Sequence, residues 1–379
     1  GTPTPPKKFH PSGAFPGSVL SSRGMPELLD ILRAAVEQRA NDLFLVPDQP
    51  PVIKRAGQLV QLQGFSAMPG AETARLILSN LYEEQRRLLQ EHLELDCTMG
   101  VPGLARFRVS LTTQARGLQA VAHVIPAAIP SPEELELPEV VTNLASLARG
   151  LVLVTGGMGS GKSTLLACLI ERINQTRDAH IVTVEDLIEY YFMPRRSVVC
   201  QREHGTHFKD RAAALRAVLK MSADVVLVGE LRDRETADAA LHLAESGPLV
   251  FATLPTTDSM QTVERIVTMF PPERQRQTQL RLASTLKGAV SQVLLPRADG
   301  SGMVAAREVM LMNLGIETAI REGKTPQIYG AIEAAVKLGM VNMDKSLVRL
   351  VAKKVVTREA ALEKSHRPDE MLSALSIVK

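Results

Sequence analysis

Residues 151–163 read LVLVTGGMGSGKS, an apolar run followed at once by a glycine-rich one. The apolar part, Leu151–Thr155, is rich in β-branched side chains, which predicts a buried strand. The second part, Gly156–Ser163, matches the pattern G-x-x-x-x-G-K-[ST] in full, and the spacing over Thr164–Ile173 predicts a helix directly after it. A strand, a glycine-rich turn and a helix in this order are typical of a loop that binds nucleotide phosphates. A chance glycine-rich turn, the alternative, would lack this context.

Each residue type in this loop has a chemical reason to be there. Glycines let backbone N–H groups approach phosphate oxygens, and the start of the following helix adds a partial positive charge. We expect Lys162 to reach the β- and γ-phosphates and the Ser163 hydroxyl to bind Mg²⁺. The residues predicted to bind the nucleotide and its Mg²⁺ are Gly156, Gly159, Ser160, Gly161, Lys162, Ser163 and Thr164.

Two more apolar runs end in carboxylates. The run from Ala223 to Glu230 predicts a buried strand, and a second predicted strand ends at Glu185, with Glu189 shortly after it. Because the carboxyl ends of parallel strands face the nucleotide crevice, Glu230 is predicted to orient and deprotonate the attacking water, with Glu189 as a second acid. A surface charge or a helix cap is the alternative for each. This segment lacks the N-K-x-D motif that reads guanine, so ATP is favoured over GTP.

The second half of the chain predicts an α/β domain. Apolar runs alternate with helical spacing from about residue 139, which is typical of a parallel sheet covered by helices on both faces. The last 60 or so residues predict helices alone. We therefore assign residues 139–379 to one α/β domain that contains the phosphate loop.

The first half predicts a tail, a smaller domain and a linker. Residues 1–24 are rich in Pro and Gly and predict a flexible tail. Residues 25–126 combine short alternating runs with two helical stretches, the second over about Ala71–Glu94, which predicts a small α+β domain. Prolines then interrupt both periods, so residues 127–138 are predicted to be a linker.

The composition excludes several classes of protein. The 379 residues are 45% hydrophobic and 22% charged, as in ordinary globular proteins. The net charge of +3, the 3% aromatic content and the absence of Trp disfavour a helicase-like motor on nucleic acid, so no nucleic-acid partner is expected. No apolar run reaches the ~18 residues that span a bilayer, and no signal-peptide core appears at the start. Three isolated Cys form no zinc set, so we expect free thiols in a cytoplasmic protein.

With these motifs in order, the sequence resembles the PilT/PilU branch of the secretion ATPases, the motors of type IV pilus retraction. The resemblance covers about residues 25–350. It rests on the phosphate loop, on the acidic runs TVEDLIE (residues 183–189) and VGELRD (residues 228–233), and on IREGKTPQIY (residues 320–329). The extension motors of the assembly branch usually carry a four-cysteine zinc site, which three unpaired Cys exclude here.

The resemblance implies a ring-shaped homohexamer whose subunits consist of a PAS-like N-terminal domain and a RecA-like ATPase domain. It also implies work against a pilus platform protein at the cytoplasmic side of the inner membrane, with a second PilT-like ATPase as a further candidate partner. By motif position, Glu189 is the acidic-box glutamate and Glu230 the catalytic glutamate. Secretion ATPases reach the γ-phosphate with arginines of the N-terminal domain, and the candidates are Arg106, Arg108 and Arg116. For these arginines, a solvated strand face is the alternative.

The sequence departs from the family at its histidine box, where this chain has Pro248 and Pro255. Histidine offers a donor or an acceptor near neutral pH, whereas proline has neither a polar side chain nor a backbone N–H. Two hypotheses follow. If Lys162, Ser163 and Glu230 are sufficient, the chain hydrolyses ATP and drives retraction. If they are not, it is an ATP-binding accessory or regulatory subunit with slow or no hydrolysis.

Overall fold

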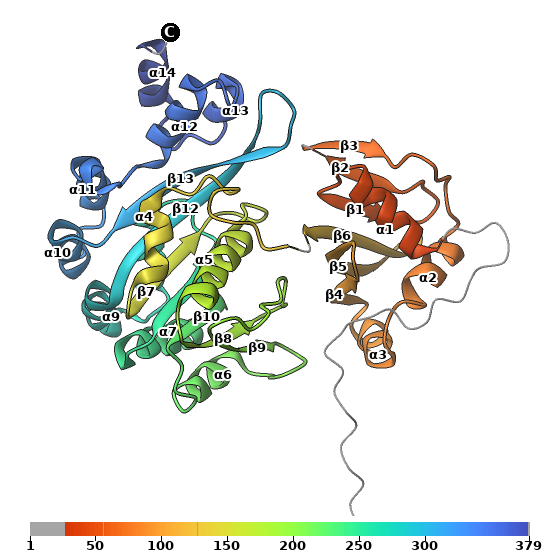
Figure 1. The fold of residues 1–379 in the computed structure, drawn as a ribbon, viewed down its shortest axis with the longest axis horizontal. Helices are drawn as coiled ribbons and strands as arrows, with labels where there is room; N and C mark the ends of the chain where they lie inside the picture. Colours follow the sequence, from red (N-terminus) through yellow and green to blue (C-terminus); the bar gives the residue numbers. More distant parts are fainter. Residues whose placement is uncertain (1–26, 56, 127, 378–379) are drawn as a thin grey trace, which may run out of the picture. The chain divides into compact units, whose positions relative to one another are not determined.

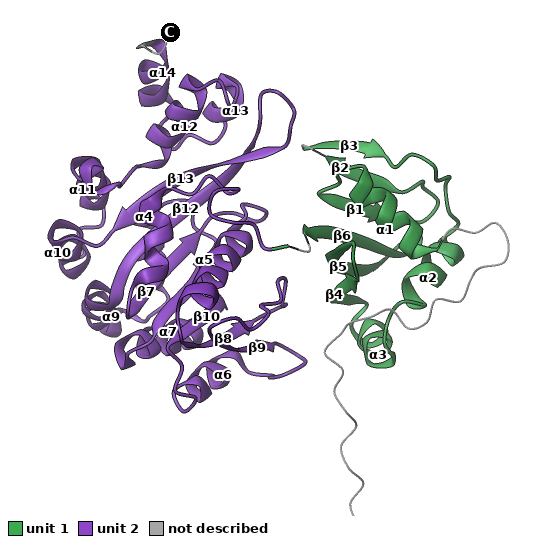
Figure 2. Cartoon of the chain, in the orientation of Figure 1, with its two compact units in different colours: residues 1–128 green, residues 129–379 purple. Residues whose placement is uncertain are grey.

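The computed structural model describes residues 27–55, 57–126 and 128–377. It divides the chain into two compact units, residues 1–128 and residues 129–379 (Figure 2). The predicted flexible tail, residues 1–24, lies outside the described residues. Within the described part, no helix has both the length and the apolar character that a membrane crossing demands.

The first unit is an antiparallel sheet with three helices among its described residues (Figure 1). Its strands follow the order β3-β2-β1-β6-β5-β4, and each neighbouring pair is antiparallel. The strands are β1 (Asp42–Leu45), β2 (Val52–Arg55), β3 (Gln58–Gln61), β4 (Glu94–Val101), β5 (Ala105–Gln114) and β6 (Gly117–Pro126). The helices are α1 (Leu28–Glu37), α2 (Gly70–Leu78) and α3 (Glu83–His92).

Side-chain spacing explains most of these elements. The buried residues of α1 are Leu28, Ile31, Leu32 and Ala35, which share one helix face. Buried and half-buried residues alternate over most of β5, as expected for a strand with one face on a core. The single helical stretch predicted near residues 71–94 is two helices, because the Asn80 side chain donates to the carbonyl oxygen of Leu76 over 2.8 Å and takes over a helix-end acceptor.

The second unit is a seven-stranded sheet with helices (Figure 1). The order is β13-β12-β7-β11-β10-β8-β9; six strands are parallel, and β13 is antiparallel to β12. The strands are β7 (Gly150–Thr155), β8 (His180–Glu185), β9 (Val198–Glu203), β10 (Val225–Glu230), β11 (Leu249–Leu254), β12 (Leu286–Pro296) and β13 (Met303–Leu311). The helices are α4 (Glu139–Thr142), η1 (Asn143–Ser146), α5 (Lys162–Thr176), α6 (Arg211–Val218), α7 (Arg234–Ser246), α8 (Ser259–Thr268), α9 (Pro272–Thr285), α10 (Leu314–Glu322), α11 (Gln327–Ala334), η2 (Val336–Leu338), α12 (Met343–Ala352), α13 (Arg358–Leu362) and α14 (Pro368–Ile377).

The phosphate loop follows a fully buried central strand. All six residues of β7 are buried, and the strand pairs with β11 on one side and β12 on the other. The register sets Leu254 against Thr155 and Glu230 against Thr253. The carboxyl ends of β7, β11, β10 and β8 therefore share one edge of the sheet, which is where open α/β sheets bind their ligands.

Candidate phosphate-binding site

The loop backbone explains two of its glycines. Gly156 has a φ of +146°, and a Cβ built on it would lie 2.3 Å from the carbonyl oxygen of Gln292. Gly161 precedes α5 with a φ of +84°, and its Cβ would lie 2.7 Å from Nε2 of Gln292. At Gly157 and Gly159 a Cβ would meet nothing within 4 Å. The loop is therefore tight against β12 and open on its outer side.

Lys162, the first residue of α5, folds back onto the loop. Its ammonium donates to the carbonyl oxygens of Gly156 and Gly157 over 2.7 and 2.8 Å. Burial lowers the pKa of Lys162, and the charges of Glu230 and Glu189 oppose this shift. Both predicted acids are thus within electrostatic reach of the predicted phosphate-binding lysine.

Three hydroxyl residues of the loop have different surroundings. The buried Ser160 Oγ has no hydrogen-bond partner among the described residues. Ser163 is exposed on the first turn of α5, and Thr164 Oγ1 lies 3.1 Å from the Tyr190 hydroxyl. An unpartnered hydroxyl, an open glycine cradle and a helix N-terminus fit the triphosphate of ATP and its Mg²⁺. Ser163 thus presents an exposed hydroxyl at the start of α5, and Ser160 presents a hydroxyl with no partner among the described residues.

Glu230, the last residue of β10, belongs to an ion-pair network. Arg232 Nε lies 3.6 Å from its carboxylate, and the same guanidinium lies 2.9 Å from Asp186. Arg211 also pairs with Asp186. Asp186 and Arg211 are not among the site residues predicted from the sequence. The sequence feature that could have pointed to Asp186 and Arg232 is their position inside the two acidic runs, residues 183–189 and 228–233.

Glu185 ends β8 at the same sheet edge. Its Oε1 is buried and has no hydrogen-bond partner among the described residues. Burial raises the pKa of Glu185 to about 7. A Cβ on Gly229, the residue before Glu230, would lie 3.6 Å from the Glu185 Cα, so the two strand ends are closely packed here.

The two histidine-box prolines lie at opposite ends of β11. Pro248 precedes the strand, and its carbonyl oxygen accepts from Gly150, where β7 begins. Pro255 follows Leu254, whose carbonyl oxygen accepts from Gly156 of the loop over 3.2 Å. A strand of six residues spans about 20 Å. Only Pro255 is therefore on the phosphate-loop edge of the sheet.

The three candidate arginines belong to the first unit. Arg106 and Arg108 are half-buried on one face of β5, and Arg106 donates to Thr98 Oγ1 over 3.3 Å. Arg116 is exposed in the turn between β5 and β6, where its N–H donates to Gln114. Arg106 and Arg108 thus share a face, while Arg116 stands apart from them.

Comparisons with known proteins match this geometry. The model of the family described as "Type II/IV secretion system protein" matches residues 132–369. The type IV pilus retraction ATPase PilT of Pseudomonas aeruginosa is 39% identical over 90% of this chain and 99% of its own length. The type IV pilus ATPase PilU of the same organism is 36% identical over 89% of this chain and 88% of its own. A crystal structure of the retraction motor PilT with bound ADP aligns with a TM-score of 0.80 at 39% identity, covering 91% of this chain and 99% of the other. These matches confirm the predicted fold class.

Proposed function

The chain belongs to the type II/IV secretion ATPase family, among the type IV pilus retraction ATPases, and from this we propose that it is an ATP-hydrolysing motor that powers pilus retraction. The observation that supports this best is the electrostatic link between the loop and the acids. Lys162 begins the helix after β7, Glu230 ends β10, and the charges of Glu230 and Glu189 both act on the Lys162 ammonium. An ATPase needs a phosphate-binding cation and a water-activating carboxylate in one place.

We assign the following roles to the residues of this edge. Lys162 exchanges its two loop carbonyl acceptors for oxygens of the β- and γ-phosphates. Ser163 holds Mg²⁺, which, when bound, neutralises charge on those oxygens. Glu230 accepts the proton of the attacking water, and Arg232 orients its carboxylate. Glu189 adds a second negative charge that opposes the lowering of the Lys162 pKa by burial.

For the N-terminal domain we propose that one of Arg106, Arg108 and Arg116 supplies charge to the γ-phosphate across a subunit boundary. A guanidinium in a closing interface stabilises the charge that develops during phosphoryl transfer. The shared face of Arg106 and Arg108 on β5 supports these two before Arg116. Neutralising the active arginine should lower turnover more than ATP binding. An unchanged rate for all three variants would reject the assignment.

The assembly we propose is a homohexamer at the base of the pilus, on the cytoplasmic side of the inner membrane. Residues 25–126 form its N-terminal domain, residues 139–379 its ATPase domain and residues 127–138 the linker, in keeping with the division of the chain after residue 128. Its partners are a membrane-embedded platform protein and a second PilT-like ATPase. The similarity to PilT and PilU supports each of these assignments.

The second candidate function is an ATP-binding accessory or regulatory subunit with slow or no hydrolysis. One observation favours it: Pro255, at a histidine position of the family, follows directly on the strand residue that hydrogen-bonds the phosphate loop. A polar side chain is thus missing beside the site. The loss of one such donor typically lowers a rate about 10²- to 10³-fold.

Steady-state hydrolysis of Mg²⁺-ATP by the full chain separates the two functions, with Lys162→Ala and Glu230→Gln measured alongside. A motor shows turnover that both substitutions abolish, while Glu230→Gln still binds ATP. Turnover no greater than that of Lys162→Ala, with ATP still bound by the unmodified chain, would establish the accessory subunit instead.

A further inference from the structure

Arg307, on β13, is a buried charge that forms no ion pair with a carboxylate among the described residues. Its side chain is 7% exposed. Nε donates to Oε1 of Gln292 over 2.7 Å, and the two terminal nitrogens donate to the carbonyl oxygens of Leu135 and Glu136 over 2.9 and 3.4 Å. Burial lowers the pKa of Arg307 to about 10, so the guanidinium remains charged at neutral pH. A charge buried in this way is costly unless its hydrogen bonds are well made.

Gln292, on the neighbouring strand β12, extends this contact to the phosphate loop. It is 3% exposed, and its Nε2 donates to the carbonyl oxygen of Ser160 over 2.6 Å. A guanidinium can only donate, so Arg307 fixes the amide oxygen of Gln292 on its own side. The amide nitrogen must then point at the loop. The orientation of Gln292 therefore depends on Arg307.

The other end of this chain of hydrogen bonds is an ordered turn, residues 131–137, just after the division between the units. Leu135 N–H donates to Ser131 over 3.1 Å and Leu137 N–H to Pro132 over 2.9 Å. Glu136 has a φ of +49°, a left-handed conformation that is uncommon for a residue with a side chain. Arg307 binds the carbonyl groups of Leu135 and Glu136 at this strained position and holds the turn in place.

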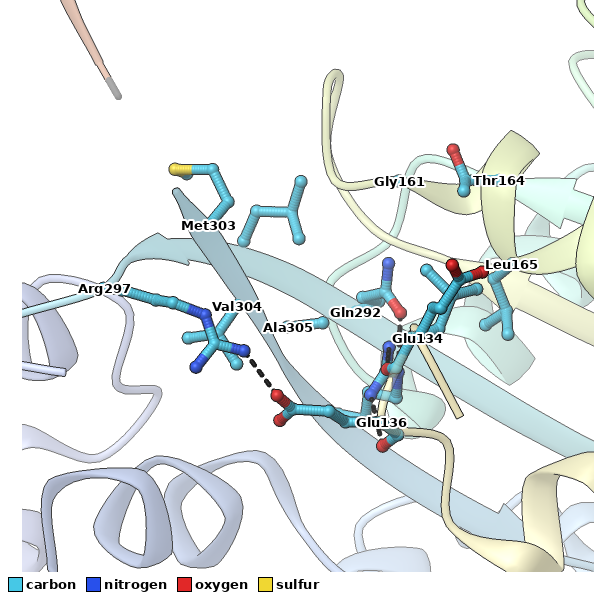
Figure 3. A pocket seen from close by; sticks show the side chains of 13 residues that line it. Glu134, Glu136, Gly161, Thr164, Leu165, Gln292, Arg297, Met303, Val304 and Ala305 are labelled. Atoms are coloured by element: carbon cyan, nitrogen blue, oxygen red, sulfur yellow. Dashed lines mark hydrogen bonds and ion pairs between the residues drawn. The ribbon is translucent and has the colours of Figure 1, made fainter. Parts of the chain in front are cut away.

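One pocket of about 170 Å³ is lined by the turn 131–137, by Arg307 and Gln292, and by the end of the phosphate loop. Figure 3 shows this pocket from close by. Glu134 and Glu136 of the turn, Gln292 of β12 and Gly161 at the end of the loop are all part of its wall. Arg297, the residue directly after β12, pairs with the Glu136 carboxylate across the pocket. The turn is thus tied to the sheet by its backbone and by a side chain.

We propose that Arg307 is a positioning residue that couples the phosphate loop to the turn 131–137 through Gln292. The proposal rests on the proposed function in one respect, that a nucleotide binds the loop. The loop must change partners when this happens, because Lys162 gives up its contacts to Gly156 and Gly157. Ser160, whose hydroxyl has no partner among the described residues, is the loop residue held by Gln292. The hydrogen bonds of this chain are 2.6–2.9 Å long, so a displacement of Ser160 must displace Gln292 and Arg307 as well, and with them the turn.

Hydrogen exchange of the turn amides tests this coupling, measured on the full chain with and without saturating Mg²⁺-ADP. In the unmodified chain, ADP should slow exchange at Leu135 and Leu137 about tenfold, because a nucleotide that holds the loop also disfavours local opening of the turn that is coupled to it. Arg307→Met should reduce this slowing to less than about twofold, because the turn loses its anchor. Gln292→Glu should do the same by a different route: it keeps an acceptor for Arg307 but loses the donor to Ser160.

Arg177 provides the matched control. Its guanidinium also donates to two backbone carbonyl groups, those of Ala145 and Leu147, over 3.2 and 2.9 Å, but it has no contact with Gln292. Arg177→Met should therefore keep the ADP-dependent slowing at the turn. Should Arg307→Met fail to fold, Gln292→Glu alone carries the test.

The possible outcomes distinguish a failure of the proposed coupling from a failure of the proposed function. A folded Arg307→Met or Gln292→Glu that binds ADP and keeps the full slowing would overturn the coupling and leave the ATPase intact. The same holds if the unmodified chain binds ADP and the turn does not respond. An unmodified chain that binds no ADP would overturn the proposed function, and the coupling with it.

Discussion

Gly156 and Gly157 are adjacent but differ in what they can tolerate. A Cβ on Gly156 would lie 2.3 Å from the Gln292 carbonyl oxygen and 2.4 Å from Ser160 Oγ, at a φ of +146°. Nothing lies within 4 Å of a Cβ on Gly157. We expect Gly156→Ala to weaken ADP binding at least tenfold and to destabilise the protein by about 1–3 kcal/mol, through strain and displaced loop atoms. Gly157→Ala should change either quantity little. Titration with a fluorescent ADP and denaturant unfolding measure both, and equal behaviour of the two variants would contradict the observed loop conformation.

Glu185 makes stability depend on pH. Its pKa is about 7 in the folded protein, against an ordinary value of 4.5, because its carboxylate is buried. Between these values the folded protein holds a proton that the unfolded chain releases. The contribution of Glu185 to stability is therefore fully present below pH 4.5 and is lost as the pH rises through 7. We expect Glu185→Gln to stabilise the protein by about 1–3 kcal/mol at about pH 8 and much less at about pH 5. Urea unfolding at both pH values measures this. Exposed Glu359→Gln is the control, and a pH-independent effect of Glu185→Gln would argue against a buried ionisable group.

At the scale of elements, β11 separates the effects of the two prolines. Pro255 follows the end of the strand that bonds the phosphate loop, and Pro248 precedes the other end. A histidine at position 255 would add a donor beside the phosphates, so Pro255→His should raise turnover about tenfold or more. Pro248→His should leave turnover within about twofold, since a strand of this length separates it from the loop. Measuring kcat for both variants and the unmodified chain under the same conditions tests this difference. A larger gain from position 248 would mean that this end of β11 acts on another subunit's site.

An element can be predicted from the sequence when the residues that determine it are consecutive in the chain. The strand Leu151–Thr155 and the loop after it are encoded within thirteen consecutive residues, and the structure has β7 and α5 where the sequence places them. The break between α2 and α3 was missed because it depends on one side-chain amide, that of Asn80.

The connection from Arg307 to the loop was missed for a different reason. Gln292 and Ser160 are 132 positions apart, and Leu135 is 172 positions from Arg307. No local pattern marks residues that the sheet alone brings together. The same holds for the position of Pro255, which acquires meaning only from the register of β11 against β7.

Among the described residues, each unit has its own hydrophobic core, and this predicts how the molecule unfolds. One core joins α1 and α2 to the sheet of the first unit, through residues such as Ile31 and Phe107. Another joins β7, β10 and β11 to α7 and α9 in the second unit, through residues such as Leu153 and Leu282. Each core closes within its own unit, so we expect two transitions in calorimetry.

The phosphate loop lies in the second unit alone, and nucleotide should therefore act on one transition. A ligand that binds only the folded state at 100 times its Kd stabilises that state by about 2.7 kcal/mol. Saturating Mg²⁺-ADP should raise the midpoint of the second unit's transition by several degrees and leave the first in place. Lys162→Ala should abolish the shift without merging the transitions, because it removes a phosphate contact and no core residue. If ADP raised both midpoints together, the nucleotide would be bound by both units. In that case the arginines of β5 would be the first residues to substitute, since Arg106 and Arg108 are half-buried cations on one face of that strand.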